Sequence, residues 1–301
     1  MRPAVTVRPV EDRRLFAIGL MVLAFLCFTG IDTTAKWLVT EGGMPSPAVV
    51  FIRYLGHLAL VLAIFLPQDG SGLFRSHRPG LSIWRAVFLM LSTACNFAAL
   101  QYLPLTLTIS IFFASPLIIC ALSIPILGET VGWRRWAAIV VGFIGILIVV
   151  RPGLGEVHWA VIFSLTATTC ASVYMVLTRK MAGVDATETQ QFYAAGIATL
   201  CMLPFALADW AWPQDAASWT AFALIGFFGW AGHQCLTIAH RFAPASVLAP
   251  FVYLQIVFMT ASSWWIFGDA PDVWVLVGAS VVMLSGLYIW LRERQLTEGE
   301  T

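Results

Sequence analysis

Charged residues are scarce in this sequence. They make up 11% of its 301 residues, whereas 59% are hydrophobic. An ordinary soluble domain has about 25% charged and roughly 45–50% apolar residues. A soluble globule could not hide so much apolar surface, so the composition indicates a chain whose partner is the lipid bilayer. The net charge is only +1 and there is no basic tail or stripe, which argues against a nucleic-acid partner.

Paired cysteines are absent as well. All six cysteines lie inside apolar runs, and none belongs to a CxxC motif. Disulfide frameworks and metal sites need close or loop-borne cysteines. We therefore expect small core residues, and we expect no bound metal and no cofactor. The six are Cys27, Cys95, Cys120, Cys170, Cys201 and Cys235.

Catalytic signatures are also missing. The sequence contains no HExxH or GxSxG motif, no paired carboxylates in the middle of an apolar run and no Walker A loop. These absences argue against an intramembrane enzyme and against direct use of ATP. The charge rings or repeated filter motif of a channel are not visible either. A channel or a membrane receptor is therefore a weak candidate.

What the sequence does contain is ten long apolar runs. A membrane-crossing helix needs about 20 mostly apolar residues, and the short breaks between the runs carry glycine and proline. Lipid offers no partners to exposed backbone groups, and continuous apolar runs are unlike the alternating strands of a barrel, so each run is predicted to be a helix. The predicted spans are 15–39, 48–66, 81–102, 104–127, 132–150, 157–179, 188–208, 218–240, 244–267 and 273–291.

Lysine and arginine are distributed unevenly around these spans. Of the 17 in the chain, only Lys36 and Arg151 fall on one side, Arg53 lies within the second span, and all the others fall on the opposite side. The side richer in positive charge is cytoplasmic. Both termini are therefore predicted to be cytoplasmic, in a multi-pass protein of the cell inner membrane. Two cytoplasmic termini require an even number of spans.

The sequence also repeats itself. A shift of 140 residues places Pro104 on Pro244 and Gly128 on Gly268, and it gives seven identities over positions 95–129 without a gap. The repeat unit has five spans, so the second copy enters the membrane from the opposite face, which is a common transporter plan. The predicted segments are a cytoplasmic tail over 1–14, two repeats over 15–152 and 153–292, and a second cytoplasmic tail over 293–301.

The motifs at the ends of the matching spans resemble a known family. The run Tyr102-Leu-Pro104 … Leu127-Gly128-Glu129 and its echo Phe242-Ala-Pro244 … Phe267-Gly268-Asp269 resemble the EamA domain of the drug/metabolite transporter (DMT) superfamily. Within it, the chain is most similar to YddG-type bacterial amino-acid exporters. The resemblance implies an all-α protein of ten helices in an inverted 5+5 repeat, with spans 1, 3, 4, 6, 8 and 9 around a central cavity. It also implies export of amino acids or related metabolites.

Few ionisable residues lie inside the spans. Asp32 and Lys36 are four residues apart on the first span, so they share a helical face and can pair. Arg53 lies at a similar depth in the second span. Two interpretations stay open for these three residues, a structural ion-pair cluster near the outer interface or a gating and coupling group. His57 is either a packed core histidine or part of a proton relay.

Neutral polar residues within the spans are candidates for a cavity lining. Pro116 and Pro250 interrupt spans 4 and 9, and a proline frees a backbone carbonyl four residues earlier. Such carbonyls, with hydroxyl and amide groups, would suit an amino acid, although helix–helix hydrogen bonding is the alternative for each side chain. The candidate substrate-binding residues are Asn96, Ser110, Phe113, Ser115, Thr168, His233, Gln234, Pro250, Tyr253 and Gln255.

These features predict a secondary transporter that works by alternating access and is not an enzyme. Few charges and several aromatic residues inside the spans favour neutral or aromatic amino acids as the small-molecule substrate. A multidrug or other metabolite exporter of the same fold is the alternative. Most of the 13 tryptophans, Trp159 among them, lie near span ends, as in an interfacial aromatic belt. We expect the protein to be monomeric.

Overall fold

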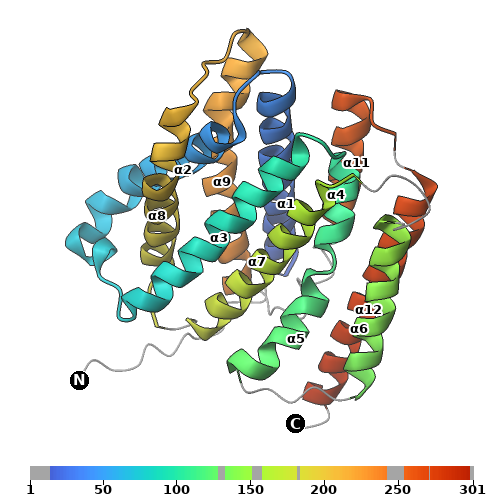
Figure 1. Ribbon diagram of the computed structural model, residues 1–301. Coiled ribbons are helices and arrows are strands. Elements are labelled where there is room, and N and C mark those ends of the chain that lie inside the picture. The colour runs from blue at the N-terminus through green and yellow to red at the C-terminus, as the bar shows by residue number, and fades with distance from the viewer. Residues whose placement is uncertain are drawn as a thin grey trace, which may run out of the picture.

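The structure is a computed structural model that describes residues 14–127, 133–150, 158–181, 184–242, 254–270 and 272–298. These residues form a bundle of helices with no strand among them (Figure 1). The helices are α1 (Arg14–Thr40), α2 (Ser46–Asp69), η1 (Gly70–Phe74), α3 (Pro79–Leu100), α4 (Leu105–Phe112), α5 (Ser115–Leu127), α6 (Trp133–Val150), α7 (Val161–Lys180), α8 (Thr187–Ala208), α9 (Ala216–Phe242), α11 (Leu254–Phe267) and α12 (Val273–Glu298).

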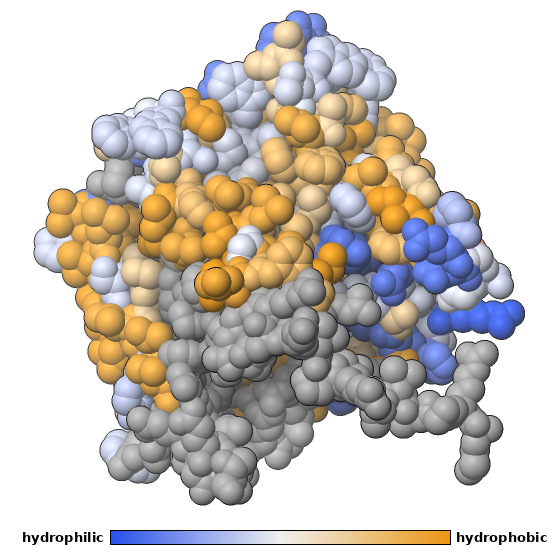
Figure 2. Space-filling view, turned by 180° about the vertical axis from the view of Figure 1, so that it is seen from behind, coloured by the Kyte–Doolittle hydropathy of each residue, from blue (hydrophilic) through white to orange (hydrophobic). Residues whose placement is uncertain are grey.

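Helical residues lie in each of the predicted spans. Among the described residues, α1, α2, α3, α7, α8 and α9 are long and apolar enough to cross a membrane, judged by length and composition. Large apolar side chains point outward, and Leu200 and Trp265 are 71% and 79% exposed. Hydrophobic residues cover the middle of the face shown in Figure 2. A multi-pass helical membrane protein is therefore confirmed, while the count of ten crossings stays a prediction.

The fourth predicted span, 104–127, is divided into two helices. α4 ends at Phe112 and α5 begins at Ser115, with a turn at Phe113 and Ala114 between them. Pro116 follows this turn and has no backbone N–H, so it cannot donate a helical hydrogen bond to the carbonyl of Phe112. The break lies where the sequence placed a proline interruption, and it puts irregular backbone in the middle of the bundle.

The helices pack in pairs across the bundle. α1 lies against α9 and α3 against α7, while α2 packs on α8 and α6 packs on α12. Further contacts join α2 to α9, α3 to α8, α1 to α11, and α5 to α7. The loops form two ends of the bundle. We call them the Asp269 end, which holds the α1–α2 and α11–α12 connections, and the Asp185 end, which holds the α2–α3 and α7–α8 connections.

α2 and α9 come into close backbone contact at two glycines. A Cβ atom added to Gly226 would lie 2.6 Å from the Cα of Gly56, and one added to Gly56 would lie 2.9 Å from the Cα of Gly226. Small residues allow such close backbone contact between membrane helices. This contact positions the polar residues of α2 against α9.

Candidate functional site

A cluster of polar side chains fills the space among α1, α2, α3, α8 and α9. The sequence analysis singled out six of its members, Asp32, Arg53, His57, Asn96, His233 and Gln234. The structure brings these together with three others. The interior polar cluster consists of Asp32, Arg53, Tyr54, His57, Thr93, Asn96, Gln191, His233 and Gln234.

One part of the cluster joins α1 and α2 to α3. Asn96 donates a hydrogen bond from Nδ2 to Asp32 Oδ1 at 2.8 Å. Arg53 donates from Nη1 to Thr93 Oγ1 at 3.1 Å, and its guanidinium lies 4.4 Å from the ring centroid of Tyr54. Among the described residues, Asp32 therefore has an amide partner and forms no ion pair with Arg53 or Lys36.

The other part joins α2 to α8 and α9. His57 Nε2 lies 3.3 Å from Gln191 Oε1, and Gln191 donates from Nε2 to Gln234 Oε1 at 2.9 Å. The ring of His57 stacks on that of His233, with a centroid distance of 5.9 Å, and the ring of Phe28 meets His233 edge-on at 5.2 Å. This arrangement fixes the orientation of both histidines inside the bundle.

Lys36 pairs with a residue far away in the sequence. Its Nζ lies 2.5 Å from Asp269 Oδ2, and it also lies 4.5 Å from the ring centroid of Phe267. Asp269 is the acid of the second glycine–acid motif, and Gly268 takes the positive φ of 71° that favours glycine. The ion pair ties α1 to the α11–α12 connection at the Asp269 end.

The remaining candidates within the described residues are buried inside the bundle, and three of them form hydrogen bonds within or between neighbouring helices. Ser110 and Thr168 donate to the backbone carbonyls of Thr106 and Ser164, four residues earlier in their own helices. The hydroxyl of Ser115 lies 3.1 Å from that of Ser172 and joins α5 to α7. Phe113 and Gln255 are buried. Pro250 and Tyr253 lie outside the described residues.

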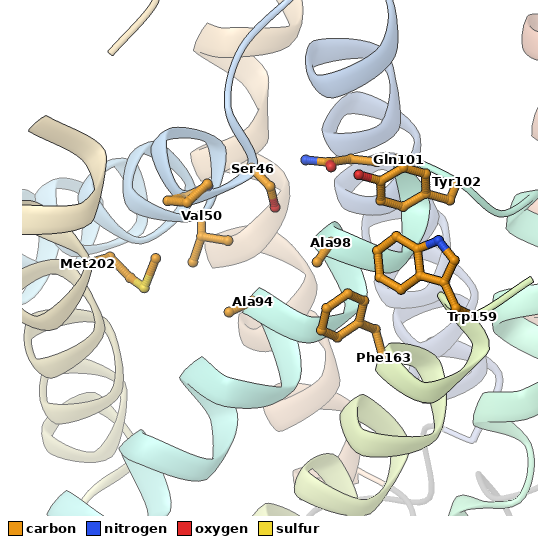
Figure 3. Close-up of a pocket in the computed structure, with 10 residues that line it drawn as sticks. Ser46, Val50, Ala94, Ala98, Gln101, Tyr102, Trp159, Phe163 and Met202 are labelled. Carbon is orange, nitrogen blue, oxygen red and sulfur yellow. The ribbon is translucent and has the colours of Figure 1, made fainter. Parts of the chain in front are cut away.

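A pocket of about 340 Å³ opens at the Asp269 end, between α2, α3, α7 and α8. Figure 3 shows aromatic side chains on one side of it and aliphatic ones across from them. Tyr102 and Trp159 have ring centroids 4.9 Å apart, and Trp159 and Phe163 have theirs 5.6 Å apart. The lining residues are Ser46, Pro47, Val50, Ala94, Ala98, Gln101, Tyr102, Trp159, Phe163 and Met202. The size and apolar lining suit a small ligand with a flat ring.

The pocket and the interior polar cluster lie along the same helices. On α2, Ser46 and Val50 line the pocket, and Arg53 and His57 follow at intervals of three or four residues, so they lie on one helical face. On α3, Thr93 of the cluster is next to Ala94 of the pocket lining. On α2 the cluster begins at Arg53, about one helical turn beyond Val50, and on α3 its residues lie at the depth of the pocket lining.

A buried arginine joins three helices near the Asp185 end. Arg85 of α3 donates from Nε to Thr178 Oγ1 at 2.8 Å and from Nη2 to the hydroxyl of Tyr174 at 3.2 Å, both on α7. A third bond, from Nη1, reaches the carbonyl of Gln190 on α8 at 3.3 Å. The helices that open at one end around the pocket are thus tied together at the other.

A second contact at this end involves Asp185, in the α7–α8 connection. Its carboxylate accepts hydrogen bonds from Ser76 Oγ at 2.5 Å and from the backbone N–H of His77 at 2.8 Å. Partial burial acts to raise the pKa of Asp185, but the hydrogen bonds from Ser76 and His77 outweigh it and hold that pKa below its usual value. The contact joins the α2–α3 and α7–α8 connections.

An Asp185→Asn variant should therefore unfold at a lower temperature than the wild type at neutral pH, by about 2 °C or more. Because the folded-state pKa is lowered, the contribution of the carboxylate is fully present above about pH 4 and is lost as the pH falls further. Thermal unfolding in detergent between pH 7 and pH 3 would measure this. The exposed Asp209, changed to Asn, is the control. A difference between wild type and Asp185→Asn that grows toward low pH would contradict the assignment.

Comparison with known proteins gives the family. The EamA-like transporter family matches the chain at residues 15–151 and again at residues 158–291. The chain belongs to the EamA-like transporter family. The resemblance to EamA-domain proteins of the DMT superfamily, predicted from the sequence, is confirmed. Members of this family are named as membrane transporters of small molecules.

Several curated relatives of this EamA-like transporter extend over nearly its whole length. It is 28% identical to a riboflavin transporter of Rhizobium johnstonii, over 94% of each chain. It is 26% identical to an S-adenosylmethionine uptake transporter of Rickettsia felis, over 93% of this chain and 94% of the relative. It is also 26% identical to a pseudopaline exporter of Pseudomonas aeruginosa, over 92% of this chain and 96% of the relative. None of these three names includes amino-acid export, which stays a prediction.

A solved crystal structure shares the fold of this EamA-like transporter. The two superpose with a TM-score of 0.62 at 18% sequence identity, over 91% of this chain and 98% of the other. At this level of identity the likeness supports the architecture, while the nature of the ligand has to be argued from the residues of this chain.

Proposed function

We propose that this protein is a secondary transporter of a small metabolite that carries a flat aromatic or heteroaromatic ring. The observation that carries the proposal is the pocket at the Asp269 end, where Tyr102, Trp159 and Phe163 present adjacent aromatic rings. The interior polar cluster begins about one helical turn farther along α2, at Arg53. A ring can stack in the pocket while its polar substituents reach the cluster.

Two substrate classes satisfy this description. The sequence predicts aromatic amino acids. Two relatives are named for riboflavin and for S-adenosylmethionine. Riboflavin has an isoalloxazine ring, and S-adenosylmethionine has an adenine ring. All of these are flat rings with polar substituents. Export is the proposed direction, from the resemblance stated above, although the relatives' names include both uptake and export.

For the architecture we propose ten spans in two inverted repeats, over 15–152 and 153–292, with both termini cytoplasmic. The helix packing supports this proposal. In the two repeats, α1 corresponds to α7, α2 to α8, α3 to α9 and α6 to α12. The contact of α1 with α9 then corresponds to that of α7 with α3, and the contact of α2 with α9 corresponds to that of α8 with α3. All four contacts occur. In such a protein, rocking of the two repeats gives alternating access. The open pocket at the Asp269 end and the Arg85 contacts at the other then correspond to an outward-open state.

A Trp159→Ala variant should reduce the transport of ring-bearing substrates by about tenfold. Loss of a stacking partner costs roughly 1–3 kcal/mol per ring in comparable sites. The measurement is counterflow in proteoliposomes with labelled tryptophan, riboflavin and S-adenosylmethionine, with glutamate as a substrate without a ring.

The matched control is Trp265→Ala, because Trp265 lies on α11 and is 79% exposed. Transport of ring compounds should be intact in this variant. If glutamate exchanges as fast as the ring compounds, or if Trp159→Ala transports like Trp265→Ala, the proposed substrate class is wrong.

A further inference from the structure

Two buried nitrogen atoms on α2 have no hydrogen-bond partner among the described residues. They are Arg53 Nε and His57 Nδ1. The two side chains are 5% and 3% exposed, so bulk water does not reach them. A buried polar group without a partner costs free energy. Such atoms in a transporter interior point to a ligand that provides the missing bonds.

Both nitrogens face the same glycine on α9. A Cβ atom added to Gly229 would lie 3.9 Å from each of three atoms, which are Arg53 Cγ, Arg53 Nε and His57 Nδ1. The neighbouring Gly226 is different, because a Cβ there would strike the backbone of α2. Because Gly229 has no side chain, α9 leaves room beside Arg53 and His57, and both nitrogens border this room.

The hydrogen-bond pattern determines what each nitrogen offers. Gln191 donates through its Nε2 to Gln234, so its Oε1 accepts from His57 Nε2. The neutral imidazole then carries its proton on Nε2 and presents a lone pair on Nδ1. Arg53 Nε always carries a proton and donates. The site thus offers one donor and one acceptor side by side.

A single atom that accepts from one neighbour and donates to the other is the oxygen of a hydroxyl group or of a water molecule. A carboxylate oxygen can accept from Arg53 Nε, but it has no proton for the lone pair of His57 Nδ1. An ammonium group would be repelled by the guanidinium. An ether or ketone oxygen leaves Nδ1 without a donor.

We infer that Arg53, His57 and Gly229 form a hydroxyl-binding subsite for the transported molecule. This inference rests on the proposed function and narrows its substrate class to ring compounds with a hydroxylated side chain or sugar. Arg53 and His57 continue the face of α2 that lines the aromatic pocket. A ring stacked on Trp159 therefore directs its hydroxylated part down α2 toward these two side chains.

The test compares ligands that differ only in the hydroxylated part. Riboflavin is paired with lumiflavin, in which a methyl group replaces the ribityl chain on the same isoalloxazine ring, and adenosine is paired with 9-methyladenine. Equilibrium binding to the purified full-length protein in detergent is measured by calorimetry. The wild type should bind the hydroxylated member of at least one pair about tenfold or more tightly than its partner, the range expected for hydrogen bonds that include a charged donor.

Gly229→Ala is the decisive variant, because its methyl group would crowd an oxygen held between the two nitrogens. It should abolish the preference for the hydroxylated ligand while leaving ring binding unchanged. Gly196→Ala is the matched control. Gly196 lies on α8, and a Cβ there would also lie 3.9 Å from a side chain of α2, but that side chain is the apolar Leu58. This control should keep the preference.

Equal affinity within both pairs, no binding by any of the four compounds, or the same behaviour of Gly229→Ala and Gly196→Ala would overturn the subsite. The first result would mean that the two nitrogens hold an ordered water only. The proposed function is tested separately by counterflow with the same compounds. If the protein binds the hydroxylated ligands more tightly but shows no counterflow, the proposed transport is wrong and the subsite stands. If it shows counterflow but no preference for hydroxylated ligands, the subsite is wrong and the proposed transport stands.

Discussion

A Gly226→Ala variant should be much less stable than the wild type and should unfold at a clearly lower temperature. The added Cβ would lie 2.6 Å from the Cα of Gly56, a separation that real Cβ atoms essentially never show. The obstacle is backbone and not the end of a flexible side chain, so α2 and α9 have to move apart. Overpacking costs about 1–3 kcal/mol in ordinary cores and more where the backbone must shift. That is a large part of a total stability of about 5–15 kcal/mol.

Fluorescence-detected size-exclusion chromatography and thermal unfolding in detergent would measure the loss. Gly56→Ala should behave similarly, since its Cβ would lie 2.9 Å from the Cα of Gly226. Gly19→Ala on α1 is the control, because nothing lies within 4 Å of the added atom. Alanine is also the better helix former, so this control should be at least as stable as the wild type. A Gly226→Ala variant as stable as Gly19→Ala would show that α2 and α9 are not in contact here.

The helices could be predicted because the hydrophobic effect acts on local composition. Apolar runs gave the positions of the spans, and Pro116 gave the interruption between α4 and α5. The Gly56–Gly226 contact had no comparable signal. In the sequence, a glycine inside a helix indicates only a weak helix former. Its contribution to helix packing depends on which residue lies opposite in the folded bundle. Contacts between residues far apart in the chain decide this.

The candidate site could be predicted only in part, because contacts between distant residues decide which side chains belong to it. Ionisable residues in a span attract attention individually, so Asp32, Arg53 and His57 were found. Gln191 was missed because a single amide near a span end has no distinctive spacing, yet it links His57 to Gln234.

The pocket was missed for a different reason. Trp159 has the sequence position of an interfacial anchor, and 58% of it is exposed. Its partner Tyr102 belongs to another span, and only the packing of α3 beside α7 brings the two rings together.

An Asp269→Asn variant should be markedly destabilised and should lose transport. Lys36 is 7% exposed, so without its carboxylate partner it becomes a nearly buried, unpaired cation. Breaking a fully buried pair costs about 3–5 kcal/mol. The side chain of Asp269 is 33% exposed, so water weakens the interaction and about 2 kcal/mol is expected. Thermal unfolding in detergent and counterflow in proteoliposomes are the measurements.

The double variant Lys36→Met with Asp269→Asn separates the two interpretations that the sequence left open for Lys36. Replacing both members of a buried ion pair by neutral groups is often nearly neutral for stability, so the unfolding temperature should return close to that of the wild type. If the pair is only structural, counterflow should return with it. If the pair gates the Asp269 end, the contact between α1 and the α11–α12 connection no longer depends on charge, and transport should stay impaired in a stable protein. An Asp269→Asn variant with wild-type stability and transport would contradict both interpretations.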